Sequence, residues 1–277
     1  MGTIPGCGFV PPELAPGDQD GFGPDAGVQE PDDPDLPVDP IRLACQQAVA
    51  GLSFTWEADD EGWTHDRMPE VAEYSSGVWP FEHWERGAAT SGPGACNTGA
   101  GCWATNLDDN YVSCQRGYLE SPAMDLSECA TVDIELVFFQ SFDFWSGRVS
   151  NRDRFDGGII EVSGDGGASW QSIGKDSYNG VIDINPDLRS GLTTYSCLEK
   201  DEFYVDGKPG YVQQSNGWLR TQLAIPTDAR TDQFQIRFVY GGGVVFPTIQ
   251  PSVAMQHTGP GWYLDDLSVE LVDPAAE

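Results

Sequence analysis

Residues 163–170 read SGDGGASW and fit the Asp-box pattern SxDxGxxW at each specified position. In this pattern Asp165 accepts backbone hydrogen bonds inside a tight turn, and Gly166 and Gly167 can adopt the positive φ angles that the turn needs. Trp170 then folds back onto the sheet. The stretch therefore predicts a β-hairpin wherever two strands meet tightly.

The Asp box is best known from the β-propeller blades of sialidases, where it recurs with the blade repeat of about 40 to 50 residues. The nearest imitation here, ADDEGW at residues 58–63, lacks both the serine and the spacing. A sialidase would also need several arginines that converge on a substrate carboxylate, and the arginines here are scattered. We interpret the box as a structural hairpin and not as the mark of a sialidase.

The composition around the box is typical of an all-β protein. The chain of 277 residues holds 33 Gly, 20 Pro and 11% aromatic residues. Short alternating segments recur, and no long run has helical period. Strands are expected at GLSFTWEA, CWATNL, YLES, TVDIELVFF, GIIEVS, WQSIG, QFQIRFVY and WYLDDLSVEL, with loops and short strands over residues 175–219.

The net charge is −30, from 44 acidic against 14 basic residues. This charge would repel nucleic acid and anionic lipid headgroups, so nucleic acid is excluded as a partner. An excess of carboxylates is compatible with an extracellular calcium-binding protein, and equally with a charge that serves only solubility.

Seven cysteines occur without a CxxC or zinc-type arrangement, which indicates structural disulfides outside the cytosol. Proximity along the chain favours the first two of the pairings below, and the third joins two of the cysteines that are left. The expected pairs are Cys96–Cys102, Cys114–Cys129 and Cys45–Cys197.

Cys7 remains alone, at the head of an acidic, Pro-rich segment without Lys or Arg. Residues 1–40 are therefore expected to form a disordered tether. The sequence IPGC resembles the lipobox of a bacterial lipoprotein, although Pro5 replaces the usual small residue. Cys7 is expected to be either an acylated lipid anchor or an unpaired thiol. No run of some 18 apolar residues predicts a transmembrane segment.

A set of ordered stretches extends over residues 41–273: FTWEADDEGWTH, FEHWERGAATSGPG, CWATNLDDNY, YLESPAMDLS, DGGIIEVSGDGGASW and GWYLDDLSVEL. In these stretches the chain resembles the MAM-like jelly-roll domains of bacterial secreted and surface proteins. They are related to the β-sandwich modules of immune inhibitor A type metallopeptidases. The resemblance implies a jelly-roll β-sandwich of two antiparallel sheets, in which the Asp box forms one hairpin.

The peptidase activity of the multidomain relatives does not carry over, because the chain has no HExxH motif. It also has no GxSxG elbow and no Gly-rich phosphate loop. Paired carboxylates could serve a glycosidase, but so acidic a chain offers many surface pairs. We therefore expect a non-catalytic protein.

A calcium site is the strongest chemical prediction. The ion takes six to eight oxygens, and the resemblance implies an ion between the first and last strands. Adjacent strand residues face opposite sides, so one of Asp265 and Asp266 should face the ion, with Asp265 favoured. The alternative is that the acids only cap turns. The expected ligands are Glu57, Asp59, Asp60, Asn106, Asp108, Asp265 and Asp266, with Asp109 as a further candidate.

Two other acid clusters, at residues 151–156 and 183–187, lack the glycine and distal glutamate of an EF-hand loop. We interpret both as exposed turns.

Tryptophans in polar, loop-like surroundings could stack on sugar rings. The candidates for ligand binding are Trp63, Trp84 and Trp145, with Arg148 close to Trp145 in the sequence. Trp103, Trp170 and Trp262 belong to the stretches quoted above and are expected in the core.

The sequence thus predicts a non-catalytic extracellular or cell-surface module that binds a glycan or a surface protein and is stabilised by calcium. The alternatives are a secreted glycan-active hydrolase and a structural envelope lipoprotein. The sequence carries no signal of an oligomeric state.

Overall fold

The computed structural model describes residues 39–67, 84–111, 116–145, 156–182, 204–241 and 258–273. Strands dominate these residues, together with one α-helix and two short 3-10 helices. The elements are α1 (Pro40–Val49), β1 (Ser53–Phe54), β2 (Thr64–Arg67), β3 (Glu85–Gly87), β4 (Cys102–Ala104), β5 (Arg116–Glu120), η1 (Ser127–Cys129), β6 (Ile134–Asp143), β7 (Gly157–Ser163), β8 (Gln171–Ile173), β9 (Gly180–Val181), β10 (Pro209–Val212), β11 (Leu219–Ala224), η2 (Thr227–Ala229), β12 (Gln235–Gly241) and β13 (Gly261–Leu271).

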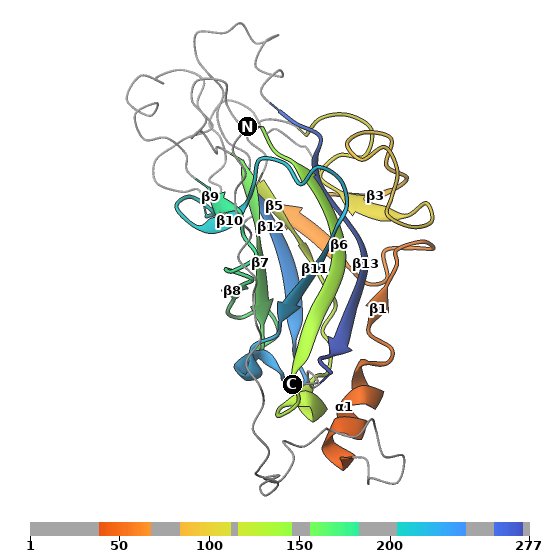
Figure 1. Cartoon of the computed structure of the whole chain (residues 1–277), viewed down its shortest axis with the longest axis vertical. Helices are drawn as coiled ribbons and strands as arrows, with labels where there is room; N and C mark the ends of the chain where they lie inside the picture. The colour runs from red at the N-terminus through yellow and green to blue at the C-terminus, as the bar shows by residue number, and fades with distance from the viewer. Residues whose placement is uncertain are drawn as a thin grey trace, which may run out of the picture. The chain divides into compact units, whose positions relative to one another are not determined.

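The strands form two antiparallel sheets, and their order is that of a jelly roll. The first sheet runs β11-β6-β13-β4-β3, with β1 also paired to β13. The second runs β2-β5-β12-β7-β10-β9, with β8 paired to β7. When β4, β5, β6, β7, β10, β11, β12 and β13 are numbered one to eight, the sheets read 1-8-3-6 and 2-7-4-5. This interleaving is the double Greek key of the jelly roll and confirms the predicted fold class (Figure 1).

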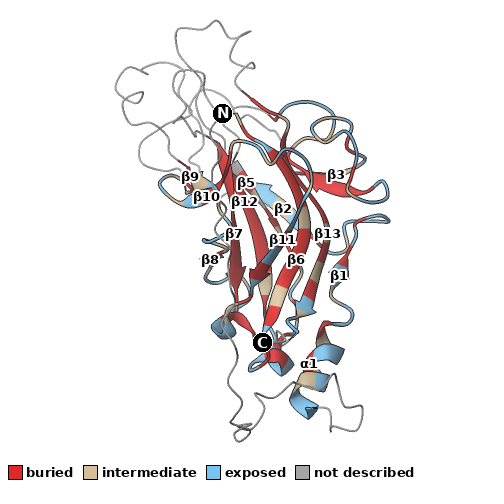
Figure 2. Cartoon of the chain, viewed as in Figure 1, coloured by how far each residue is buried: buried red, intermediate tan, exposed pale blue. Residues whose placement is uncertain are grey.

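The core lies between the two sheets, whose strands are mostly coloured as buried in Figure 2. Many of its side chains are aromatic. Trp262 of β13 is fully buried at its centre, where its indole N–H donates to Gln140 of β6 at 3.0 Å. Gly158 of β7 faces this indole, and a Cβ there would lie 2.2 Å from its ring. The glycine therefore lets the largest core side chain fit between the sheets. Phe144, Tyr211 and Phe238 also surround the Trp262 ring.

The Asp box forms the predicted hairpin between β7 and β8. The Asp165 carboxylate accepts from the Ser169 N–H at 2.8 Å and from the Ser169 hydroxyl at 2.6 Å. These bonds lower the pKa of Asp165 to about 2, the Ser169 hydroxyl contributing most. Gly166 and Gly167 have φ angles of 67° and 84°, as the turn requires.

Helix α1 precedes the sandwich, where no helix was expected. Asp39 caps it by accepting from the Ile41 N–H at 2.9 Å, and proline is favoured at a first helical position. The helix buries only Cys45 and Val49, one turn apart, so its apolar pattern is too short to stand out in the sequence.

Cys45 of α1 forms a disulfide with Cys129 of η1. The predicted pairings Cys114–Cys129 and Cys45–Cys197 are therefore wrong. The short spacing between Cys114 and Cys129 was misleading, because the helix brings Cys45 across 84 residues to the same place. Cys7, Cys114 and Cys197 lie outside the described residues.

Within the described residues, no helix combines the length and the apolar character that crossing a lipid bilayer requires. The structure describes no residue before Asp39. The tether predicted for residues 1–40 therefore lies outside the described residues except for its last two, and the lipid anchor at Cys7 lies wholly outside them. Both stay predictions.

Candidate functional site

The outer face of the first sheet carries a loop closed by a disulfide. Cys96 and Cys102 are bonded, as predicted, and bracket residues 97–101. Cys102 begins β4, so the loop is anchored directly to the sheet. Ala89, Cys96, Cys102, Ala104 and Tyr263 form a small apolar cluster beneath it, separate from the main core. We call residues 96–102 the bridged loop.

Both aspartates of the last strand hold the bridged loop. The register of β13 against β6 shifts between Asp265 and Ser268, and Asp266 has a φ of 48°. This bulge breaks the alternation of the strand, so adjacent side chains reach the same loop. Asp265 accepts from the Thr98 N–H at 3.1 Å, and Asp266 accepts from the Asn97 side chain at 2.9 Å. The prediction that only one of the two acids could face the site is wrong.

Glu57 reaches the bridged loop from the segment after β1. Its carboxylate accepts from the Ala100 N–H at 2.9 Å. Gly99 has a φ of 52°, and a Cβ there would lie 1.9 Å from a Glu57 oxygen. The glycine thus provides both the left-handed backbone and the space for the carboxylate. An acid that follows the first strand and two acids of the last strand therefore hold one loop, and the ion expected between them stays a prediction.

The environment of Asp265 strongly favours the protonated form of its carboxyl group. This residue is fully buried, and loss of water raises the pKa of Asp265 to about 7, against the lowering effect of the Thr98 N–H. The neighbouring Asp266 raises it further. No Lys, Arg or His of the described residues forms an ion pair with either acid. Asp265 is thus a buried acid beside the half-buried Asp266, with no counter-ion among the described residues, so its ionised form is costly.

The other predicted metal ligands lie in separate turns. Asp60 forms an ion pair with Arg86 at 2.8 Å, and Asp59 accepts from the Glu61 N–H at 2.8 Å. Asn106 accepts from the N–H groups of Asp108 and Asp109 in a local turn. Among the described residues, no three His, Cys, Asp or Glu side chains are placed to hold one metal ion.

The tryptophans are distributed differently from the prediction. Trp63 and Trp84 are 3% and 1% exposed, and both pack in the core. Their polar neighbours in the sequence suggested loops, but the indoles point between the sheets, so neither binds a ligand at the surface. Trp145 is half-buried against the core, and Arg148 lies outside the described ranges. Trp103 and Trp262 are buried, as expected.

Trp170 lies on the outer face of the second sheet and not in the core. Its ring covers the Arg237 guanidinium at 4.3 Å. Arg237 pairs with Glu161 at 2.7 Å across β12 and β7, and the Tyr204 hydroxyl donates to Glu161. Lys208 covers the Tyr204 ring at 3.3 Å. The charged groups of this cluster satisfy one another, which makes it a structural network.

Asp156 is also buried, at 2% exposure, although its cluster was interpreted as an exposed turn. It accepts a hydrogen bond from the Tyr111 hydroxyl, which itself accepts from the Trp145 N–H. Burial, and then the Asp156 charge, hold the pKa of Tyr111 well above its usual value. Residues 151–155 and 183–187 lie outside the described part of the chain.

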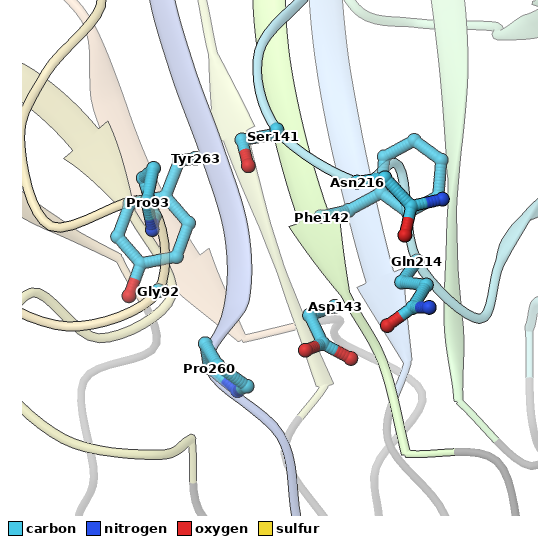
Figure 3. Close-up of a pocket in the computed structure, with 10 residues that line it drawn as sticks. Gly92, Pro93, Ser141, Phe142, Asp143, Gln214, Asn216, Pro260 and Tyr263 are labelled. Atoms are coloured by element: carbon cyan, nitrogen blue, oxygen red, sulfur yellow. The ribbon is translucent and has the colours of Figure 1, made fainter.

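A pocket of about 150 Å³ opens on the outer face of the first sheet, beside the bridged loop. Ser141 of β6 and Tyr263 of β13 are cross-strand partners in its floor. Figure 3 shows the Tyr263 ring and Pro93 on one side and the amides of Gln214 and Asn216 on the other. The remaining lining residues are Gly92, Phe142, Asp143, Gly217 and Pro260.

The two walls of the pocket are tied together. Trp218 follows the wall formed by residues 214–217, and its indole N–H donates to the Ala95 carbonyl at 3.2 Å. Ala95 directly precedes the bridged loop. No sequence pattern indicates this pocket, because its polar residues are ordinary ones at a strand end and in a loop.

No protein-family model and no curated protein matches the chain. Among solved structures, the K2 cleaved adhesin domain of Lys-gingipain aligns with a TM-score of 0.40 and 10% identity, over 80% of this chain and 98% of that one. The module CBM27-1 of Caldicellulosiruptor saccharolyticus, solved with mannohexaose, aligns with a TM-score of 0.32 and 13% identity, over 78% and 94%.

Proposed function

We propose that this chain is a non-catalytic binding module of the extracellular space or the cell surface, which recognises a glycan or a surface protein. The observation that carries the proposal is the pocket on the outer face of the first sheet. One wall, at Gly92 and Pro93, precedes the disulfide-closed bridged loop, and the opposite wall presents the polar side chains of Gln214 and Asn216. Rigid scaffolds that present loops are a common basis of recognition. The two disulfides support an oxidising compartment.

Binding of the purified protein to immobilised glycans and to extracellular proteins tests the proposal. We expect retention on at least one ligand, without release of reducing sugar or cleavage of the ligand. The matched control is the Cys96→Ala/Cys102→Ala double variant, which frees the bridged loop and should bind more weakly. Release of reducing sugar by the wild type would favour a hydrolase, and retention on no ligand would reject a binding module.

The perturbed acids of the chain do not favour the hydrolase alternative. A raised carboxyl pKa is a mark of a general acid, and Asp265 has one. However, Asp265 is fully buried and is held by the Thr98 N–H, so a substrate does not reach it. His65, the one described histidine, packs edge-on against Trp103.

We also propose that calcium binds at Asp265 and Asp266 and so stabilises the bridged loop, which Glu57 also holds. The support is the buried Asp265 beside the half-buried Asp266, with no counter-ion among the described residues, and the hydrogen bond from the Ala100 N–H of the same loop to Glu57. Calcium also accepts backbone carbonyls and water, so these acids need not be the whole ligand set. The ion would supply positive charge at Asp265 and Asp266. With or without the ion, the acids would hold the bridged loop through its N–H groups.

A MAM-like affiliation, a glycan as the ligand and an acylated Cys7 on an envelope lipoprotein complete the proposal as predictions from the sequence. Mass spectrometry of the protein isolated from its native membranes or medium would test the acylation of Cys7. A free thiol at Cys7 would reject the lipoprotein and favour a secreted module.

A further inference from the structure

Four polar side chains around the pocket make no hydrogen bond with another described residue. Ser141 is 6% exposed, and its hydroxyl makes no hydrogen bond with any part of the described chain. The side chains of Asp143, Gln214 and Asn216 also make no hydrogen bond with a described residue. These three are exposed to solvent, and they face a common space with Ser141 (Figure 3). Removal from water alone raises the pKa of Asp143. By contrast, the charged cluster around Arg237 on the other sheet is satisfied internally.

The mixture of donors and acceptors selects the class of ligand. Gln214 and Asn216 each present two N–H donors and one carbonyl, whereas the Asp143 carboxylate only accepts. An ammonium group carries donors alone and would leave the amide N–H groups unpaired. An anion would face Asp143 in a chain with a net charge of −30. A neutral hydroxylated ligand both donates and accepts, so it satisfies every group.

The volume of the pocket and its apolar walls limit the size and the shape of the ligand. A volume of about 150 Å³ equals roughly five water molecules in the liquid. It is well below the roughly 300–1,000 Å³ of drug-sized sites. Pro93 and Pro260 are half-buried and offer apolar surface of the kind that contacts the C–H groups of a sugar ring, whereas the Tyr263 ring beside them is buried. The pocket thus fits one ring and not an extended chain.

We infer that the pocket is the subsite for a single neutral hydroxylated ring, such as one hexose unit of a glycan. This inference rests on the proposed function and specifies its ligand. Asp143 accepts from ring hydroxyls, Gln214 and Asn216 both donate and accept, and Ser141 bonds the group that enters deepest.

NMR titration of the folded protein tests the inference, with glucose, galactose, mannose and N-acetylglucosamine as neutral probes. Sialic acid serves as the anionic probe and n-butylammonium as the cationic one. We expect at least one neutral sugar to shift the backbone amides of Ser141 and Gln214 at millimolar concentration. Asp143→Ala should weaken this binding by roughly 10-fold and Gln214→Ala severalfold.

Asp232→Ala is the matched control. It removes the same charge from an exposed acid outside the pocket and should leave the affinity unchanged. Melting temperatures equal to that of the wild type would show that the variants fold. The inference is overturned if no neutral sugar shifts these amides, if the ammonium or sialic acid shifts them instead, or if both pocket variants bind the sugar normally. If the inference is overturned but the wild type is still retained on immobilised glycans or proteins, the proposed function remains supported.

Discussion

At the scale of single residues, three carboxyl groups of the described chain are buried, and Glu161 is the one that pairs with an arginine, Arg237. The carboxyl group of Asp156 accepts a hydrogen bond from the Tyr111 hydroxyl, which partly replaces the lost water. Asp265 receives backbone N–H bonds from Thr98 and Asp266 but lies beside a second carboxylate. Burial without a counter-ion favours the neutral form of an acid, so these environments should respond differently to pH and to substitution.

Asp265 should make the metal-free protein less stable as the pH rises. Its pKa in the folded state is about 7, above the value near 4 expected in the unfolded chain. Between these values the folded state binds more protons, so its contribution to the free energy of unfolding falls as the pH rises from about 4 through about 7. Urea unfolding in chelator across this range measures the slope, and Asp265→Asn should flatten it. A wild-type slope unchanged by the substitution would contradict the assignment.

Tyr111→Phe should destabilise the protein by about 1–3 kcal/mol. The substitution removes the hydrogen bond to buried Asp156 and the acceptor for the Trp145 N–H, while it keeps the ring. Tyr118→Phe is the control, because the Tyr118 hydroxyl makes no hydrogen bond within the described residues and its ring is half-buried on an outer face. Chemical unfolding should show a change of at most about 0.5 kcal/mol for the control. Equal losses would mean that the Asp156 contact contributes nothing.

At the scale of secondary-structure elements, the length of a strand and the pattern of its apolar residues decided whether the sequence could predict it. The strands β6, β7, β12 and β13 span seven to eleven residues with apolar runs, and all were expected. The short β2 and β3 were not, because two to four residues carry no period. Strand β11 was also missed, since its polar residues face outward in LRTQLA.

The candidate site could be predicted only in part, for a related reason. Acid clusters at strand ends, together with the ion position that the resemblance implied, pointed to Glu57 and Asp265. The bulge that turns Asp266 onto the same loop, however, is a tertiary feature without a sequence signal here. Trp63 and Trp84 were misplaced because polar neighbours along the chain do not fix the direction of a side chain in a short strand or turn.

The two disulfides should stabilise the fold to different extents. The Cys45–Cys129 bond closes 84 residues and the Cys96–Cys102 bond closes six. In the chain-entropy account the long loop contributes about 4–5 kcal/mol and the short one about 2 kcal/mol. Urea unfolding of the two double alanine variants in chelator compares them. A larger loss for the short loop would indicate that strain or residual structure, and not loop length, sets the effect.

At the scale of the whole sandwich, contacts from distant parts of the sequence converge on the outer face of the first sheet. Glu57 after β1 and the acids of β13 hold the bridged loop. Trp218, before β11, is bonded to Ala95 at the start of that loop and borders the pocket wall. Whatever orders the bridged loop therefore also fixes the distance between the pocket walls. Stability and ligand binding should be linked through this loop.

Calcium should act on this arrangement as a stabiliser. An ion that binds the folded chain and not the unfolded one adds about 2.7 kcal/mol at one hundred times its dissociation constant, so the melting temperature should rise with Ca²⁺ and fall back with chelator. Asp265→Asn and Glu57→Gln should abolish most of the shift, while Asp232→Asn, at an exposed acid outside the loop, should leave it intact. Bound calcium should also reverse the pH slope, because it favours the ionised form of Asp265. A melting temperature unchanged between chelator and excess Ca²⁺, with the domain folded throughout, would show that the acids hold the bridged loop through its N–H groups alone.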